Sequence, residues 1–126
     1  MEPKPVLLFV EDNDDVARIA ENKLESYGFF VLRYNRGYEV IEQLRDHDIL
    51  YDIALVDLEL PRVSGAEVVR ELKMKYLHRP IFTWSGYELE RKVSHSEGHI
   101  IKPAIRKERW IELESMLKSS LPSRFR

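Results

Sequence analysis

Residues 53–57 read IALVD, four consecutive apolar side chains followed by an aspartate. An uninterrupted apolar run of this length is typical of a strand buried on both faces, as in a parallel sheet covered by helices. Residues 6–10, VLLFV, repeat the pattern and are followed by Glu11 and Asp12. The two runs therefore predict buried strands that each lead directly into acidic side chains.

Amphipathic segments and further apolar runs alternate along the rest of the chain. We expect helices over 14–27, 38–45, 66–76, 87–93 and 110–121, and further strands over 29–34, 81–84 and 100–101. Gly28 follows the first helix as a natural stop. Five alternations of strand and helix predict an α/β fold, a doubly wound five-stranded parallel sheet with helices on both faces.

Length and charge restrict the class of protein. A chain of 126 residues can form one domain with a real core and is too short for two ordinary domains. Its 20 Lys and Arg against 22 Asp and Glu leave a net charge of −2, unlike a dedicated nucleic-acid binder. The absence of cysteine excludes disulfides, thiolate zinc sites and cysteine nucleophiles. The apolar run at 6–10 is too short for a membrane span or a signal-peptide core, so we expect a cytoplasmic protein.

Functional groups of a doubly wound sheet collect at the carboxyl ends of its strands. The predicted ends bring together Glu11, Asp12, Asp57, Ser85 and Lys102. Carboxylates about 4 Å apart repel by on the order of 4 kcal/mol per pair at an effective dielectric near 20. Because the ligands are all oxygen, Mg²⁺ is the cation expected to offset this charge. The alternative for the first acidic loop is a polar cap on the following helix.

Asp57 stands inside the stretch LVDLELPRVSG over residues 55–65. A carboxylate at a strand end can be a nucleophile, since aspartate forms acyl phosphates in phosphoryl transfer. Mg²⁺ would then offset charge on the incoming phosphoryl group, while Lys102 and the Ser85 hydroxyl contact its oxygens.

Taken together, these residues resemble the receiver domain of bacterial two-component response regulators over nearly the whole chain. The matching positions are the acidic pair Glu11-Asp12, Arg18, the phospho-accepting Asp57, Leu60-Pro61, Gly65, the switch residue Ser85 and the pair Lys102-Pro103. The resemblance implies a flavodoxin-like (βα)5 fold with strand order 2-1-3-4-5. It also implies a receiver domain over 5–121 and a short C-terminal tail over 122–126. For the terminus from Ser119 to Arg126 we expect fraying, with docking through Phe125 as the alternative.

By the same resemblance, Asp57 takes a phosphoryl group from a sensor histidine kinase or a histidine phosphotransfer protein. The domain is then a signalling module rather than an enzyme, capable at most of self-phosphorylation from a donor and slow self-dephosphorylation. The implied Mg²⁺ ligands are Glu11, Asp12, Asp57 and the backbone carbonyl of Glu59. The bond between Lys102 and Pro103 is expected to be cis and to aim the lysine.

The implied output is a protein contact. Phosphorylation would alter a surface that binds an unknown downstream protein, in a monomer or weak dimer, without direct nucleic-acid binding or membrane insertion. No output domain follows Leu121, which indicates either a stand-alone regulator or a receiver cut from a larger protein.

Two features depart from the family pattern. Ser85 and Lys102 are only 17 positions apart, fewer than is usual, so we expect a short or irregular and mobile fourth helix. The switch position three residues before the lysine, usually Tyr or Phe, is His99, whose imidazole can carry charge near neutral pH. We therefore expect weak or partner-dependent coupling of phosphorylation to shape. The alternative is that His99 sits exposed and takes no part in the switch.

Other interpretations use different features. A receiver-fold scaffold that binds partners without phosphorylation would be favoured by loss of Asp57 or Lys102, and both are present. A flavodoxin-like cofactor binder or a hydrolase lacks a phosphate-cradling glycine loop here. His95 and His99 are spaced as helical metal ligands would be, but Gly98 and the strand that follows argue against a helix.

Overall fold

The computed structural model describes residues 3–103 and 106–125. Its five strands are β1 (Val6–Val10), β2 (Phe30–Tyr34), β3 (Ile53–Asp57), β4 (Ile81–Ser85) and β5 (Gly98–Ile101). Its helices are α1 (Asp14–Ser26), α2 (Gly37–Asp46), α3 (Gly65–Lys75) and α4 (Lys107–Ser120), followed by a 3₁₀ turn, η1 (Ser123–Phe125). All strand pairs are parallel, in the order β2-β1-β3-β4-β5. The predicted doubly wound α/β fold is confirmed.

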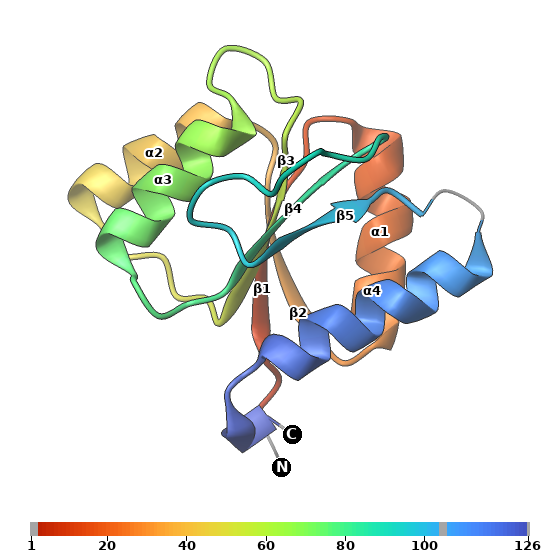
Figure 1. Ribbon diagram of the computed structural model, residues 1–126. Coiled ribbons are helices and arrows are strands. Elements are labelled where there is room, and N and C mark those ends of the chain that lie inside the picture. The colour runs from red at the N-terminus through yellow and green to blue at the C-terminus, as the bar shows by residue number, and fades with distance from the viewer. Residues whose placement is uncertain (1–2, 104–105, 126) are drawn as a thin grey trace.

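Helices cover both faces of the sheet, with α1 and α4 on one face and α2 and α3 on the other (Figure 1). Because successive side chains of a strand point to opposite faces, each central strand supplies two cores. Phe9 and Leu55 pack in the core under α1 and α4, whereas Val10 and Val56 pack under α2 and α3. All five residues of β3 are buried, as its continuous apolar run predicts.

Side-chain caps fix the starts of α1 and α3. The Asn13 side-chain oxygen accepts a hydrogen bond from the Val16 amide at 3.0 Å and so begins α1 immediately after the first acidic turn. The Ser64 hydroxyl accepts from the Glu67 amide at 3.2 Å and begins α3. Such caps satisfy backbone donors that have no partner inside the helix. Both caps therefore hold loops that follow central strands.

The predicted helix over 87–93 is wrong. Residues 86–97 form bends and turns between β4 and β5, so the alternation of strand and helix is interrupted there (Figure 1). The physical reason is the distance that this segment must span, because it carries the chain back along the length of β4 before β5 begins. A helix advances only about 1.5 Å per residue, whereas an extended chain advances about 3.3 Å. Glu97 anchors its end, because its carboxylate accepts from the Ile81 amide and lies 2.7 Å from Lys73 Nζ.

The C-terminal tail packs against the domain through residue 125, in contrast to the expected frayed end. Phe125 contacts the core under α1 and α4, and Arg124 forms an ion pair with Asp52 at 3.1 Å. Arg126 lies outside the described residues. No helix in the described part of the chain is long and apolar enough to cross a membrane.

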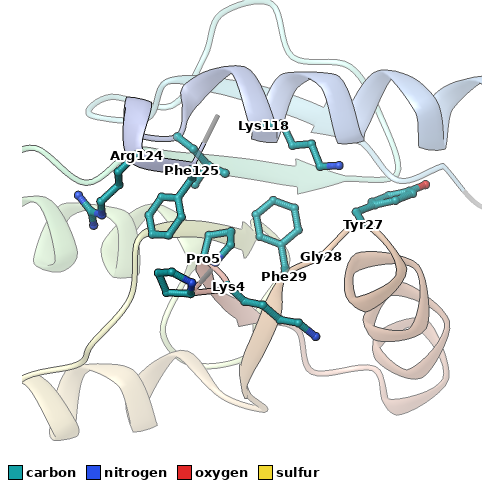
Figure 2. A pocket seen from close by; sticks show the side chains of 10 residues that line it. Lys4, Pro5, Tyr27, Gly28, Phe29, Lys118, Arg124 and Phe125 are labelled. Carbon is teal, nitrogen blue, oxygen red and sulfur yellow. The ribbon is translucent and has the colours of Figure 1, made fainter. Parts of the chain in front are cut away.

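A hollow of about 430 Å³ lies between this tail, the N-terminal segment and the turn after α1 (Figure 2). Phe29 and Phe125 face it, and Lys4, Lys118 and Arg124 stand at its edge. It borders the amino ends of β1 and β2, whereas the predicted site residues follow the carboxyl ends of the strands. The hollow is therefore separate from the candidate site.

Candidate functional site

Three carboxylates converge where β1 and β3 end. Glu11, Asp12 and Asp57 each offer one oxygen, and these atoms all lie within 4.8 Å of one another. Glu11 and Asp57 are only 0% and 1% exposed, whereas Asp12 is half-buried. The convergence follows from strand register, because Val10 lies opposite Val56 and the chain leaves both strands at the same edge. An all-oxygen cluster of this kind suits a hard divalent cation.

Lys102 enters the cluster from the end of β5. Its Nζ lies 3.0 Å from Glu11 Oε1 and donates to Asp57 Oδ2 at 3.2 Å. The Lys102 amide donates to the Ser85 carbonyl at 2.7 Å, which extends the pairing of β4 and β5 by one residue. Strand pairing therefore places this side chain, as the sequence predicts.

Burial and crowding perturb the ionisation of this cluster. Burial, reinforced by the neighbouring Asp57, raises the pKa of Glu11 to about 7, and Lys102 offsets only part of that rise. Burial by itself would lower the pKa of Lys102, but its attraction to Glu11 and Asp57 outweighs burial and raises that pKa. The Glu11 pKa thus rises mainly through burial, and the Lys102 pKa rises because two carboxylates, those of Glu11 and Asp57, surround one ammonium group. The cluster of three carboxylates and one ammonium group therefore carries a net negative charge that a bound cation would offset.

Asp57 is held from two sides. Its Oδ1 accepts from the Glu59 amide at 2.9 Å, and the following Leu58 amide donates to the Trp84 carbonyl at 3.0 Å. Gly65, the first residue of α3, lies so close that an added Cβ would be 2.1 Å from the Asp57 carbonyl oxygen. The absence of a side chain at Gly65 therefore allows α3 to begin against the backbone of Asp57.

The Ser85 hydroxyl is buried and is hydrogen-bonded to the segment of residues 86–97 that connects β4 and β5. It donates to the Tyr87 carbonyl at 3.0 Å and lies 3.0 Å from Nε2 of His99. Nε2 also lies 3.0 Å from the Tyr87 carbonyl, and Nδ1 lies 2.8 Å from the Thr83 hydroxyl. Because a carbonyl only accepts, we assign a hydrogen to Nε2, while Nδ1 pairs with the Thr83 hydroxyl. His99 is thus half-buried over two hydroxyl groups, and its role as a switch stays a prediction.

The expectation of a cis bond between Lys102 and Pro103 is wrong, since no peptide bond in residues 3–103 is cis. The trans isomer of such a bond is favoured by about 0.5–1 kcal/mol. Here the carboxylates of Glu11 and Asp57, together with the pairing of β4 with β5, already direct Lys102 into the cluster. The backbone carbonyl of Glu59 stays a predicted ligand.

One residue of the site was missed in the sequence. Arg33 of β2 donates to the backbone carbonyl of Glu11 from Nη2 at 2.8 Å and from Nε at 3.2 Å. Arg18, which the family resemblance singled out, instead forms an exposed pair with Asp15 at 2.9 Å. A charged residue within the run FVLRY of residues 30–34 was the available signal for Arg33.

Comparison with known sequences finds a family model, described as response regulator receiver domain, that matches residues 7–109. The polar-differentiation response regulator DivK of Brucella anthropi is 33% identical over 108 residues, which cover 80% of this chain and 85% of DivK. The cell cycle transcriptional regulator CtrA of Caulobacter vibrioides is 31% identical over 119 residues, or 90% of this chain and 51% of CtrA. The chain therefore spans about half the length of CtrA.

Solved structures show the same fold. The receiver domain of a sensor histidine kinase from Pseudomonas aeruginosa, with a magnesium ion coordinated in its active site cleft, superimposes with a TM-score of 0.77 at 21% identity, covering 93% of this chain and 97% of that one. The response regulator TrrA from Thermotoga maritima, in complex with Mg²⁺ and BeF, gives a TM-score of 0.73 at 21% identity, covering 93% and 100%.

Proposed function

Because this chain belongs to the response regulator receiver family, we propose that Asp57 accepts a phosphoryl group from a histidine kinase or a histidine phosphotransfer protein in a Mg²⁺-dependent reaction. The protein is thus a phospho-acceptor signalling module rather than a catalytic enzyme. The observation that carries the proposal is the buried cluster of Glu11 and Asp57, with Asp12 at its edge and Lys102 across it. We place the reaction in the cytoplasm and expect a monomer or weak dimer.

The residues present fit a magnesium ion. Glu11, Asp12 and Asp57 would supply carboxylate oxygens, and we add the backbone carbonyl of Glu59 as a further ligand. Burial and the neighbouring Asp57 raise the pKa of Glu11, because both disfavour its charged form. When bound, Mg²⁺ would offset the negative charge of both the carboxylates and the phosphoryl oxygens.

Transfer itself is a substitution at phosphorus. A carboxylate oxygen of Asp57 attacks, an O–P bond forms as the P–N bond to the donor imidazole breaks, and the electron pair of that bond returns to the ring nitrogen. Lys102 Nζ lies 3.2 Å from Asp57 Oδ2, which is near enough for it to form an ion pair with an oxygen of the phosphoryl group after transfer.

We further propose that Ser85 couples the new phosphoryl group to the protein surface. To reach a phosphoryl oxygen, its hydroxyl must leave the Tyr87 carbonyl and His99 Nε2. Residues 86–97 would then rearrange, because both the carbonyl and the amide of Tyr87, which belongs to this segment, are hydrogen-bonded to the Ser85 hydroxyl. This change would alter the affinity for a downstream protein. The alternative is a scaffold that binds its partner regardless of phosphorylation, which the complete acidic cluster disfavours.

The test is incubation with a small acyl phosphate and Mg²⁺, followed by intact mass measurement. Wild type should gain one phosphoryl mass, and excess chelator should prevent the gain. Asp57→Ala should gain none, whereas Asp15→Ala, which removes an exposed aspartate of α1, should behave as wild type. A phosphoryl mass on Asp57→Ala, or an unmodified wild type, would contradict the proposal.

A further inference from the structure

Arg33 contributes a cation to the acidic turn from outside the cluster. It lies on the face of β2 that α1 covers, and its side chain is only 19% exposed. Its guanidinium makes two hydrogen bonds to the Glu11 carbonyl, at 2.8 and 3.2 Å, and Nη2 also donates to Asp14 Oδ1 at 2.9 Å. One planar group thus connects the end of β1 to the first residue of α1.

The carbonyl that Arg33 holds belongs to the peptide unit joining Glu11 and Asp12. A peptide unit is planar, so fixing its oxygen also fixes the direction in which the chain leaves it on either side. Two further hydrogen bonds complete the restraint. The Glu11 amide donates to the backbone carbonyl of Tyr34 at 3.2 Å, and the Asn13 amide donates to the side-chain Oε2 of Glu11 at 3.2 Å. The two carboxylates of the turn therefore converge on Asp57 from a backbone that β2 holds in place.

We infer that Arg33 is a positioning residue of the divalent-cation site. It orients the peptide between Glu11 and Asp12 so that both side chains present oxygens toward Asp57. This inference rests on the proposed function, because it presumes that the cluster binds Mg²⁺. Groups that orient metal ligands typically change metal affinity by about 10–100-fold when they are removed.

The sign of the effect separates positioning from charge. The positive charge of Arg33 repels a cation bound at the neighbouring carboxylates, so charge alone predicts tighter Mg²⁺ binding when the guanidinium is removed. Loss of positioning predicts weaker binding. A purely structural role would lower thermal stability and leave the Mg²⁺ affinity of the folded protein unchanged.

The experiment is a calorimetric titration of the full chain with Mg²⁺ alone, well below the unfolding temperature, for wild type, Arg33→Met and Arg18→Met. Arg18 is the matched control, since its pair with Asp15 is on the same first turn of α1 but its side chain is 72% exposed. We expect Arg33→Met to bind Mg²⁺ about tenfold more weakly or worse, and Arg18→Met to stay within about twofold of wild type. The NMR signal of the Asn13 amide should also shift in Arg33→Met, because this amide reports on the Glu11 carboxylate.

Two results would overturn the inference in different ways. Wild type that binds Mg²⁺ while Arg33→Met binds it equally or more tightly would refute positioning alone. Wild type that does not bind Mg²⁺ would refute the proposed function and this inference with it. If Arg33→Met does not fold, Arg33→Gln keeps one donor for the Glu11 carbonyl. Because glutamine cannot make all three hydrogen bonds of the guanidinium, two to the Glu11 carbonyl and one to Asp14, Arg33→Gln should bind Mg²⁺ less tightly than wild type and more tightly than a variant without any donor. A variant with the apolar Arg33→Leu change that folds and binds Mg²⁺ as wild type does would refute the role.

Discussion

Replacing Glu11 with glutamine should stabilise the metal-free protein above neutral pH. Glu11 is fully buried, and its pKa is raised from an ordinary value of 4.5 to about 7. A carboxyl group whose pKa is raised by folding stabilises the fold only while it is protonated. Its contribution is therefore complete below about pH 4.5 and is lost as the pH rises through 7.

The size of the effect follows from the pKa difference. One pKa unit corresponds to about 1.36 kcal/mol, so the shift of Glu11 amounts to about 3 kcal/mol between the two ends of this range. Glutamine keeps the shape and carries no charge. At pH 8 without metal, Glu11→Gln should therefore unfold at a higher temperature than wild type, by roughly 10 °C for a domain of this size. At pH 4.5 the two proteins should be nearly equal.

Thermal and urea unfolding, followed by circular dichroism at several pH values with chelator, would measure this difference. Mg²⁺ should reverse the order at pH 8, because ligand binding stabilises the wild-type fold and the variant lacks one ligand. The control is Glu25→Gln, an exposed position of α1 that should show no such pH dependence. A difference between Glu11→Gln and wild type that is the same at pH 4.5 and pH 8, or a wild type that is more stable than the variant without metal at pH 8, would refute this reasoning.

Four further predictions concern the surroundings of Asp57. Gly65→Ala should destabilise the fold by about 3 kcal/mol or more, because its Cβ would lie 2.1 Å from a backbone oxygen, whereas Gly86→Ala has nothing within 4 Å and should change stability little. Lys102→Ala should still be phosphorylated in part but lose amide shift changes in β4 and β5 when a phosphate mimic binds, and wild-type shift changes would contradict its role. His99→Tyr removes the ring nitrogens that bond Thr83 and Ser85, so it should change partner affinity and its pH dependence; unchanged affinity would exclude His99 from the switch. Residues 86–97 should exchange amide hydrogens faster than α1 to α3, since they lack helical hydrogen bonds, and equal protection would contradict this.

The strands and the position of the acidic residues depend on local sequence. A continuous apolar run identifies a strand buried on both faces, and parallel strands end at one edge of their sheet. The strand order followed only from the family resemblance, whereas the buried strands and the convergence of Glu11, Asp57 and Lys102 could be predicted from the sequence for this reason. Each depends on a pattern of a few neighbouring residues.

Tertiary structure decided the features that depend on distant atoms. The helical spacing of residues 87–93 was overridden because the crossover must reach back along β4, and Glu97 holds its end to α3 through Lys73. The hydrogen bonds from Arg33 to the Glu11 carbonyl join positions 22 residues apart. They exist only because β2 pairs with β1, and no local pattern encodes a hydrogen bond whose two partners meet through sheet pairing.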